Sequence, residues 1–127
     1  DEKTGRASYE LEFPNGGQVI AIGNLIEQSQ GTENNTIISY GAEGYMWPEN
    51  RFGFVHNTVV NRRPAGGVFV RATSGDARAL LANNVFAGKG ELRLAIPATE
   101  IGNVSIGLGS LADPESYDYR LTGGELF

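Results

Sequence analysis

The sequence predicts an all-β solenoid of about four to five coils with little or no helix. The first support is a recurring pattern of an apolar run, an asparagine and a second apolar run, which is clearest from Phe54 to Asn61. The second is composition: 18 of the 127 residues are glycine, about twice average usage, which favours many turns. The third is the content of β-branched residues in short runs, which favours strands over helices.

Asparagines mark the same corner in successive copies of this repeat: Asn24, Asn57, Asn84 and, more weakly, Asn103. The numbers of residues between them differ, as in a solenoid that keeps its strands while its loops vary. We expect asparagine at each corner because the chain must bend sharply there, and asparagine tolerates the left-handed conformation better than any residue except glycine. Stacked corners are also expected to form a ladder of side-chain amide hydrogen bonds.

The first coil is predicted to begin with a half-buried strand at 8–13, where Tyr9, Leu11 and Phe13 alternate with Glu10 and Glu12. Glycines and proline then signal a turn. Its remaining elements are a turn at 14–17, a strand at 18–22, the corner at Asn24, a short strand at 25–26 and a polar loop at 27–35.

The same cycle recurs along the rest of the chain, which we expect to fold as one domain over 1–127 with loose tails at 1–7 and 122–127. Residues 76–82 contain good helix formers, but their place in the repeat favours a strand. The predicted elements are a strand at 36–41, an excursion at 42–50, strand, corner and strand at 51–61, a loop at 62–67, a strand at 68–71, a turn at 73–76, a third corner within 77–86, strands at 91–96 and 104–108, and a candidate last strand at 117–121.

Composition excludes several function classes. The net charge of −5 and the presence of only two lysines argue against nucleic-acid binding, and the Arg62-Arg63 pair is interpreted as part of a solvated loop. The absence of cysteine excludes disulfides, thiolate catalysis and cysteine-based metal sites. No apolar run approaches the ~18 residues of a membrane span, and the first residues are not those of a signal peptide.

With this repeat laid out, the chain resembles the right-handed parallel β-helix proteins of the pectate-lyase-like superfamily, and in particular the C-terminal coils of uncharacterised bacterial members. The motifs are the corners Asn83-Asn84-Val85-Phe86 and His56-Asn57-Thr58-Val59-Val60-Asn61, with the stretches 8–16 and 38–44. The resemblance implies an exported protein, extracellular or periplasmic. Such proteins usually have more N-terminal coils and a capping helix, neither of which precedes Tyr9. We therefore expect a fragment, or open ends covered by further coils, another copy or a partner chain.

The resemblance also implies that polysaccharide lies along the outward face of the first strand of each coil. Aromatic rings stack on sugars and arginine pairs with uronate carboxylates. By alternation that face carries Glu10, Glu12, Ile38, Tyr40, Phe69, Arg71 and Arg93, and the following loop adds Glu43, Tyr45, Trp47 and Glu49. The predicted ligand-binding residues are Tyr40, Tyr45, Trp47, Phe69, Arg71 and Arg93. In the alternative interpretation, Tyr45 and Trp47 fold back to cover the side of the coil.

Catalytic candidates are fewer. A lyase of this superfamily would need an Arg or Lys base and often calcium, for which Arg71, Arg93, Glu10 and Glu12 are the candidates, although no defined calcium loop is present. Glu10 and Glu12, ~7 Å apart on a strand, also fit a glycosidase pair, but a solvated face produces such pairs routinely. His56, the single histidine, excludes a two-histidine metal site and is expected to cap or fill a coil beside Asn57.

Three functions are consistent with this sequence. The leading hypothesis is a carbohydrate-binding or catalytically unassigned solenoid segment that needs no cofactor. The second, from another class, is a structural module that stacks end to end through its open coils. The third is a polysaccharide lyase, with calcium as the cofactor to test.

Overall fold

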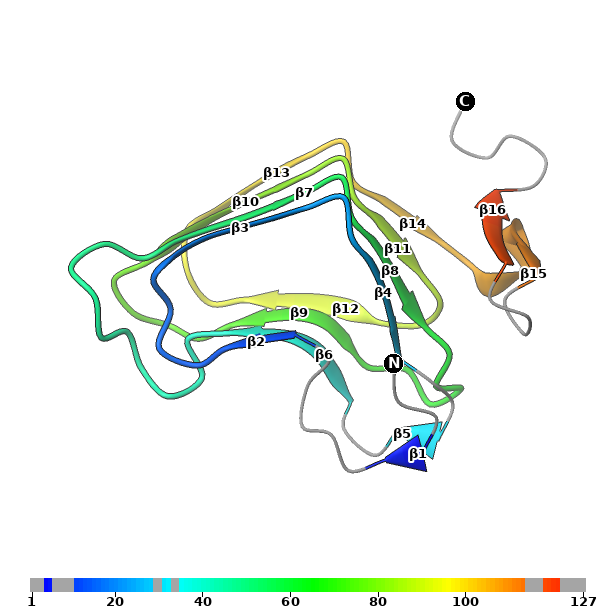
Figure 1. Ribbon diagram of the computed structural model, residues 1–127, viewed down its shortest axis with the longest axis horizontal. Helices are drawn as coiled ribbons and strands as arrows, with labels where there is room; N and C mark the ends of the chain where they lie inside the picture. Colours follow the sequence, from blue (N-terminus) through cyan, green and yellow to red (C-terminus); the bar gives the residue numbers. More distant parts are fainter. Residues whose placement is uncertain (1–3, 6–10, 29–30, 33–34, 114–117, 122–127) are drawn as a thin grey trace.

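Three parallel sheets of four strands each wind the chain into a right-handed parallel β-helix of four coils (Figure 1). The computed structural model describes residues 4–5, 11–28, 31–32, 35–113 and 118–121. The predicted fold class is therefore confirmed, with four as the number of coils. The fold implied by the resemblance is present, while membership of a superfamily stays a prediction.

Each coil contributes one strand to each sheet. The first sheet contains β2 (Leu11–Phe13), β6 (Thr36–Tyr40), β9 (Val68–Ala72) and β12 (Glu91–Leu94). The second contains β3 (Gln18–Ile22), β7 (Arg51–Val55), β10 (Arg78–Ala82) and β13 (Ala98–Ile101). The third contains β4 (Leu25–Gln28), β8 (Thr58–Asn61), β11 (Val85–Ala87) and β14 (Val104–Ile106).

Two small pairs lie outside the coils in Figure 1. Strand β1 (Thr4–Gly5) pairs in parallel with β5 (Gly31–Thr32), and β15 (Leu111–Asp113) pairs in antiparallel fashion with β16 (Asp118–Leu121), after the 3-10 turn η1 (Leu108–Ser110). The predicted loose tails thus include one strand, β1; the rest of 1–7, together with Tyr9, Glu10 and 122–127, lies outside the described residues. Residues 78–82 form a strand, so the helix alternative is wrong.

Strand register aligns side chains of neighbouring coils into rows. In the second sheet Ala21, Phe54 and Leu81 occupy one row and are all buried. Because alternate residues of a strand point to opposite faces, the intervening rows of this sheet point outward. In the first three coils this row of the interior is therefore a stack of apolar side chains, one from each coil.

Aromatic rings fill the middle of the interior. The ring of Phe52 lies 4.9 Å from Tyr40, 5.7 Å from Phe54 and 6.0 Å from Phe13, measured between centroids. Phe86 continues the stack 6.4 Å beyond Phe54. Aromatic pairs at such separations add about 0.5–1.5 kcal/mol each beyond the area they bury, which ties the first and second sheets together across the coil.

The four corner asparagines form a continuous ladder. The side-chain oxygen of Asn57 accepts from the backbone N–H of Asn24 at 2.8 Å and from its amide nitrogen at 3.0 Å. Asn84 accepts from Asn57 in the same way, at 2.8 and 3.3 Å, and Asn103 accepts from Asn84, at 2.9 Å for both contacts. In the second to fourth coils the amide nitrogen also donates to a carbonyl of the preceding coil, at 2.8 Å in each case: Asn57 to Ala21, Asn84 to Phe54 and Asn103 to Leu81.

The conformational reason predicted for these asparagines is wrong. The residue with a left-handed backbone is the one before each asparagine: Gly23 (φ 71°), His56 (φ 55°), Asn83 (φ 56°) and Gly102 (φ 67°). The preceding residue thus makes the bend, and the ladder asparagine is selected for its amide, which satisfies backbone groups of the neighbouring coils.

Candidate functional site

The first sheet is the face that the sequence predicts to bind glycan. Opposite its interior face, one register row contains Glu12, Ser39, Arg71 and Arg93, of which Ser39 is fully buried. Arg71 and Arg93 occupy the predicted outward positions. The prediction that Ile38, Tyr40 and Phe69 face outward is wrong, because the first two are fully buried and Phe69 is only 3% exposed. Neither aromatic side chain is available to stack on a sugar.

Register explains this correction. Tyr40 pairs with Phe13, and since Glu12 faces outward, Phe13 and Tyr40 face the interior. Phe69 lies opposite a register shift between Glu91 and Leu92, where strict alternation fails. Its ring packs 5.1 Å from that of Phe86 inside the coil.

The two tyrosines have structural roles. The Tyr40 hydroxyl donates to the Gly17 carbonyl oxygen, and burial, with a smaller effect of Tyr45, raises its pKa to about 12. Tyr45 donates to the Thr73 carbonyl at 2.5 Å, and burial raises its pKa as well. The Tyr45 ring lies where a Cβ on Gly41 would approach within 2.3 Å. Tyr45 therefore folds back over the coil, as in the alternative interpretation.

Trp47 behaves differently, since it stays 60% exposed on the loop between β6 and β7, which projects from the corner of the solenoid in Figure 1. Buried Asn50 holds the base of this loop. Its side-chain oxygen accepts from the Gly17 N–H at 2.9 Å, and its nitrogen donates to the carbonyls of Trp47 at 2.9 Å and Asp76 at 3.2 Å. One asparagine thus links three coils and holds the backbone of Trp47, whose indole lies beside Gly17.

A row of polar side chains on the second sheet begins next to this indole. Gln18, Arg51 and Arg78 are in register, one from each of the first three coils. Arg51 pairs with Glu49 at 3.1 Å, and both side chains are more than half exposed. We call Trp47, Gln18, Glu49, Arg51 and Arg78 the Trp–Arg strip.

Two depressions run along the Trp–Arg strip. One, of about 270 Å³, is lined by Gly17, Gln18, Trp47, Pro48 and Glu49. The other, of about 300 Å³, contains both arginines together with Asp76 and Pro97. Because Pro48 and Glu49 border both depressions, the strip is one continuous hollowed surface.

An apolar groove of about 510 Å³ adjoins the arginines. Its walls are Ile20, 73% exposed, and Leu80, 40% exposed, with Gly53 in register between them as the floor. Since glycine has no side chain, the row of Ile20, Gly53 and Leu80 leaves a depression at the second coil. The strip therefore combines an exposed ring, two cations and an apolar slot.

Sequence reasoning named Trp47 and Glu49 but missed Gln18, Arg51 and Arg78. A signal was present, because these three residues stand at the same offset before the corner residues Asn24, Asn57 and Asn84. Aligning the repeats on their asparagines, and not strand by strand, would have placed them in one row.

Three of the four catalytic candidates, Glu12, Arg71 and Arg93, lie in one register row of the first sheet. Glu12 is exposed, Arg71 is half-buried, Arg93 forms an exposed ion pair with Glu91, and Glu10 is not described. In the part of the chain that the structure describes, no three metal-binding side chains cluster. His56 is exposed at the ladder corner, so it does not fill a coil.

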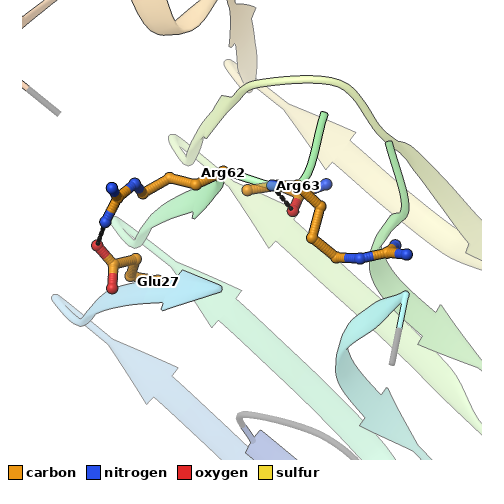
Figure 2. A network of polar contacts seen from close by, with 4 residues as sticks. Glu27, Arg62 and Arg63 are labelled. Atoms are coloured by element: carbon orange, nitrogen blue, oxygen red, sulfur yellow. Dashed lines mark hydrogen bonds and ion pairs between the residues drawn. The ribbon is translucent and has the colours of Figure 1, made fainter. Parts of the chain in front are cut away.

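The prediction of a solvated Arg62-Arg63 loop is wrong for Arg62. Its guanidinium lies 3.4 Å from the Glu27 carboxylate, and the two side chains are only 9% and 6% exposed. Figure 2 shows Arg62 reaching toward Glu27 while Arg63 extends away from it; the Arg63 guanidinium donates to the Gly66 carbonyl at 2.8 Å. Because breaking a buried pair leaves an uncompensated charge, Glu27 and Arg62 anchor the loop at 62–67 to β4.

Comparison with models of known protein families, with curated proteins and with solved structures found no match. Among the described residues, no helix has the length and apolar character to cross a membrane. The functional argument therefore rests on the Trp–Arg strip itself.

Proposed function

We propose that the chain binds an acidic polysaccharide non-catalytically along the Trp–Arg strip. The observation that carries this proposal is the alignment of Arg51 and Arg78 in one outward row beside the exposed Trp47. Like charges directly opposite on neighbouring strands destabilise a sheet, and a bound carboxylate would reverse that effect.

The geometry of the row suits an extended ligand. Neighbouring coils are ~4.8 Å apart, so a chain lying parallel to the solenoid axis meets Gln18, Arg51 and Arg78 in three successive coils. Arginine binds carboxylates with two parallel hydrogen bonds. The exposed Arg51–Glu49 pair is no obstacle, since exposed pairs contribute only about 0.2–1 kcal/mol.

The first sheet is the weaker candidate for this site, although Arg71 and Arg93 are also in register there. Arg71 is half-buried, Arg93 pairs with Glu91, and the two aromatic residues predicted for this face are buried. For these reasons a lyase at the first sheet is not proposed, and binding along the Trp–Arg strip is the function we retain.

The test is a fluorescence titration, for which Trp47, the only tryptophan, is the probe. Uronate oligosaccharides are expected to change its emission and to bind at least tenfold more tightly than neutral ones. Arg78→Gln should weaken binding about ten- to hundredfold, because a hydrogen bond to a charged group contributes about 1.5–3 kcal/mol.

Arg93→Gln is the matched control, since it removes an exposed arginine from the first sheet. Its affinity for uronate oligosaccharides should equal that of the wild type. If neither the Trp47 emission nor the heat measured by titration calorimetry changes with uronate or neutral oligosaccharides, the proposal is wrong. If Arg93→Gln loses binding and Arg78→Gln does not, the site lies on the first sheet.

A further inference from the structure

The two ends of the solenoid are open among the described residues. Inward positions that are buried in the middle coils, such as Ile38 and Phe52, are half-buried in the first coil at Leu11 and Val19 and exposed in the fourth at Ala98. In Figure 1, viewed along the stack of coils, β1, β5, β15 and β16 lie outside the outline of the coils. The edges of the first and fourth coils therefore face a region that these strands do not cover.

The asparagine ladder has a direction, so its two ends differ. The side-chain oxygens of Asn57, Asn84 and Asn103 each accept from the asparagine of the preceding coil. At the fourth coil, no hydrogen bond from the backbone N–H of Asn103 to another described residue is present, while its oxygen is used by Asn84. At the first coil, the side-chain oxygen of Asn24 accepts from no described residue. One end presents donors and the other an acceptor.

From this complementarity we infer that the fourth coil of one copy stacks on the first coil of another, head to tail and in the register of the solenoid. Asn103 would donate to Asn24 of the second copy as Asn84 donates to Asn103. In return the amide nitrogen of that Asn24 would donate to the Glu100 carbonyl, the equivalent of the Leu81 carbonyl that Asn103 uses at 2.8 Å. Three hydrogen bonds of the ladder would thus continue across the junction.

The outward rows agree with this register. Arg93 ends the row that Glu12 begins, so an exposed cation would lie opposite an exposed anion of the next copy. Ile101 likewise ends the row that Ile22 begins, and both are more than half exposed. Opposite charges and apolar pairs on neighbouring strands each contribute about 0.2–1 kcal/mol.

Glu100 opposes this stacking. It occupies the inward row of Ala21, Phe54 and Leu81, so stacking would place its carboxylate against the apolar interior of the second copy. Inward-pointing charges on edge strands are a recognised protection against uncontrolled pairing. The association is therefore weak and reversible in the wild type, and because the contact is heterologous it grows into open chains and not closed rings.

Sedimentation velocity over a wide concentration range tests the role of Glu100. Glu100→Leu should associate at least tenfold more tightly than the wild type, with mass that increases with concentration, and the isosteric Glu100→Gln should fall between them. If Glu100→Leu keeps its β spectrum by circular dichroism and remains monomeric throughout, the inference is overturned. Should Glu100→Leu not fold, Glu100→Gln decides the question by the same criterion.

Cross-linking tests the orientation without altering Glu100. The chain has no cysteine, so Ile22→Cys and Ile101→Cys introduce single thiols at the two ends. Neighbouring strands have a Cα separation within the 4.4–6.8 Å range of disulfides, so an equimolar mixture should cross-link between unlike variants on oxidation. Equal yields from the mixture and from either variant alone would contradict head-to-tail stacking.

A charge exchange provides an independent control on register. Glu12→Arg and Arg93→Glu should each weaken association about two- to five-fold, since exposed pairs contribute about 0.2–1 kcal/mol. The double variant, and an equimolar mixture of the two single variants, should recover wild-type association. A double variant no better than either single one would overturn the proposed register. None of these substitutions touches the Trp–Arg strip, so this result and the glycan titration are independent.

Discussion

Two corners of the solenoid differ in how much their length varies from coil to coil. At the ladder corner, every coil turns with two residues, a left-handed one and an asparagine, as in Gly23–Asn24 and His56–Asn57. At the corner between the first and second sheets, the connections range from 95–97 in the fourth coil to 41–50 in the second. The first corner repeats its geometry, while the second varies in length and carries Trp47.

The difference has a physical origin. At the ladder corner the asparagines of the two middle coils, Asn57 and Asn84, are buried, so the groups around them need partners at fixed positions, and one short geometry supplies these partners in every coil. The variable corner is at the surface, where water satisfies the backbone and long insertions are tolerated. The surface that we propose for binding therefore lies at the variable corner, on a scaffold held by the constant one.

Breaking the ladder at its middle is expected to have the largest effect. Asn57 is 1% exposed, and its side chain accepts from Asn24 and donates to Ala21 and Asn84. Asn57→Ala leaves several buried groups without partners and should lower the free energy of unfolding by about 3–4 kcal/mol. Equilibrium denaturation in urea measures this change.

Asn24→Ala is the matched control, because Asn24 is exposed and sits at the end of the ladder. It should lower the free energy of unfolding by about 1 kcal/mol, the contribution of a solvated hydrogen bond. Equal losses in the two variants would mean that the ladder does not depend on burial and that the contrast between the corners is mistaken.

At the variable corner, a substitution at Gly41 tests the role of the Tyr45 ring that packs over it. Gly41 has φ of 78°, and a Cβ there would lie 2.3 Å from the Tyr45 ring. Gly41→Ala adds left-handed strain and displaces the ring, so we expect a loss of about 2–3 kcal/mol. Gly44→Ala, with φ of 96° and open space around it, should show the strain alone, about 1–2 kcal/mol. Unfolding in urea gives both values, and no difference between them would contradict the role of Tyr45.

The same contrast explains which parts of the fold could be predicted. The ladder corner has a local signature, an asparagine between apolar runs, so Asn57 and Asn84 located the strands on either side without knowledge of the coil. The left-handed residue before each asparagine was not identified, because glycine, histidine and asparagine fill that position in different coils and share no single chemical property.

The candidate site was less predictable, because the register between coils decides whether a side chain points inward or outward. The sequence of residues 36–40 does not show which alternate side chains face the interior. Only the pairing of Tyr40 with Phe13 shows that Tyr40 points inward. For Phe69 even alternation fails, at the register shift in β12. Trp47 was identified because an exposed aromatic residue in a polar loop is a local feature, whereas Arg51 and Arg78 become neighbours only when the coils are stacked.

The smallest expected change in the free energy of unfolding concerns the left-handed residue of the ladder corner. His56 has φ of 55°, a conformation that costs an L-residue about 1–2 kcal/mol. His56→Gly removes that strain but adds about 0.5–1 kcal/mol of backbone entropy to the unfolded chain. The net result should be a gain of about 0.5 kcal/mol in the free energy of unfolding.

Asn83→Gly is the comparison at the same position of the next coil, with φ of 56°. Because asparagine tolerates the left-handed region better than histidine, this change should leave the stability nearly constant. Paired urea curves, with repeats that resolve a few tenths of a kcal/mol, distinguish the two. A clear loss in His56→Gly would mean that the exposed imidazole itself stabilises the corner, since its backbone N–H, which donates to the Ala82 carbonyl at 3.0 Å, is kept by glycine.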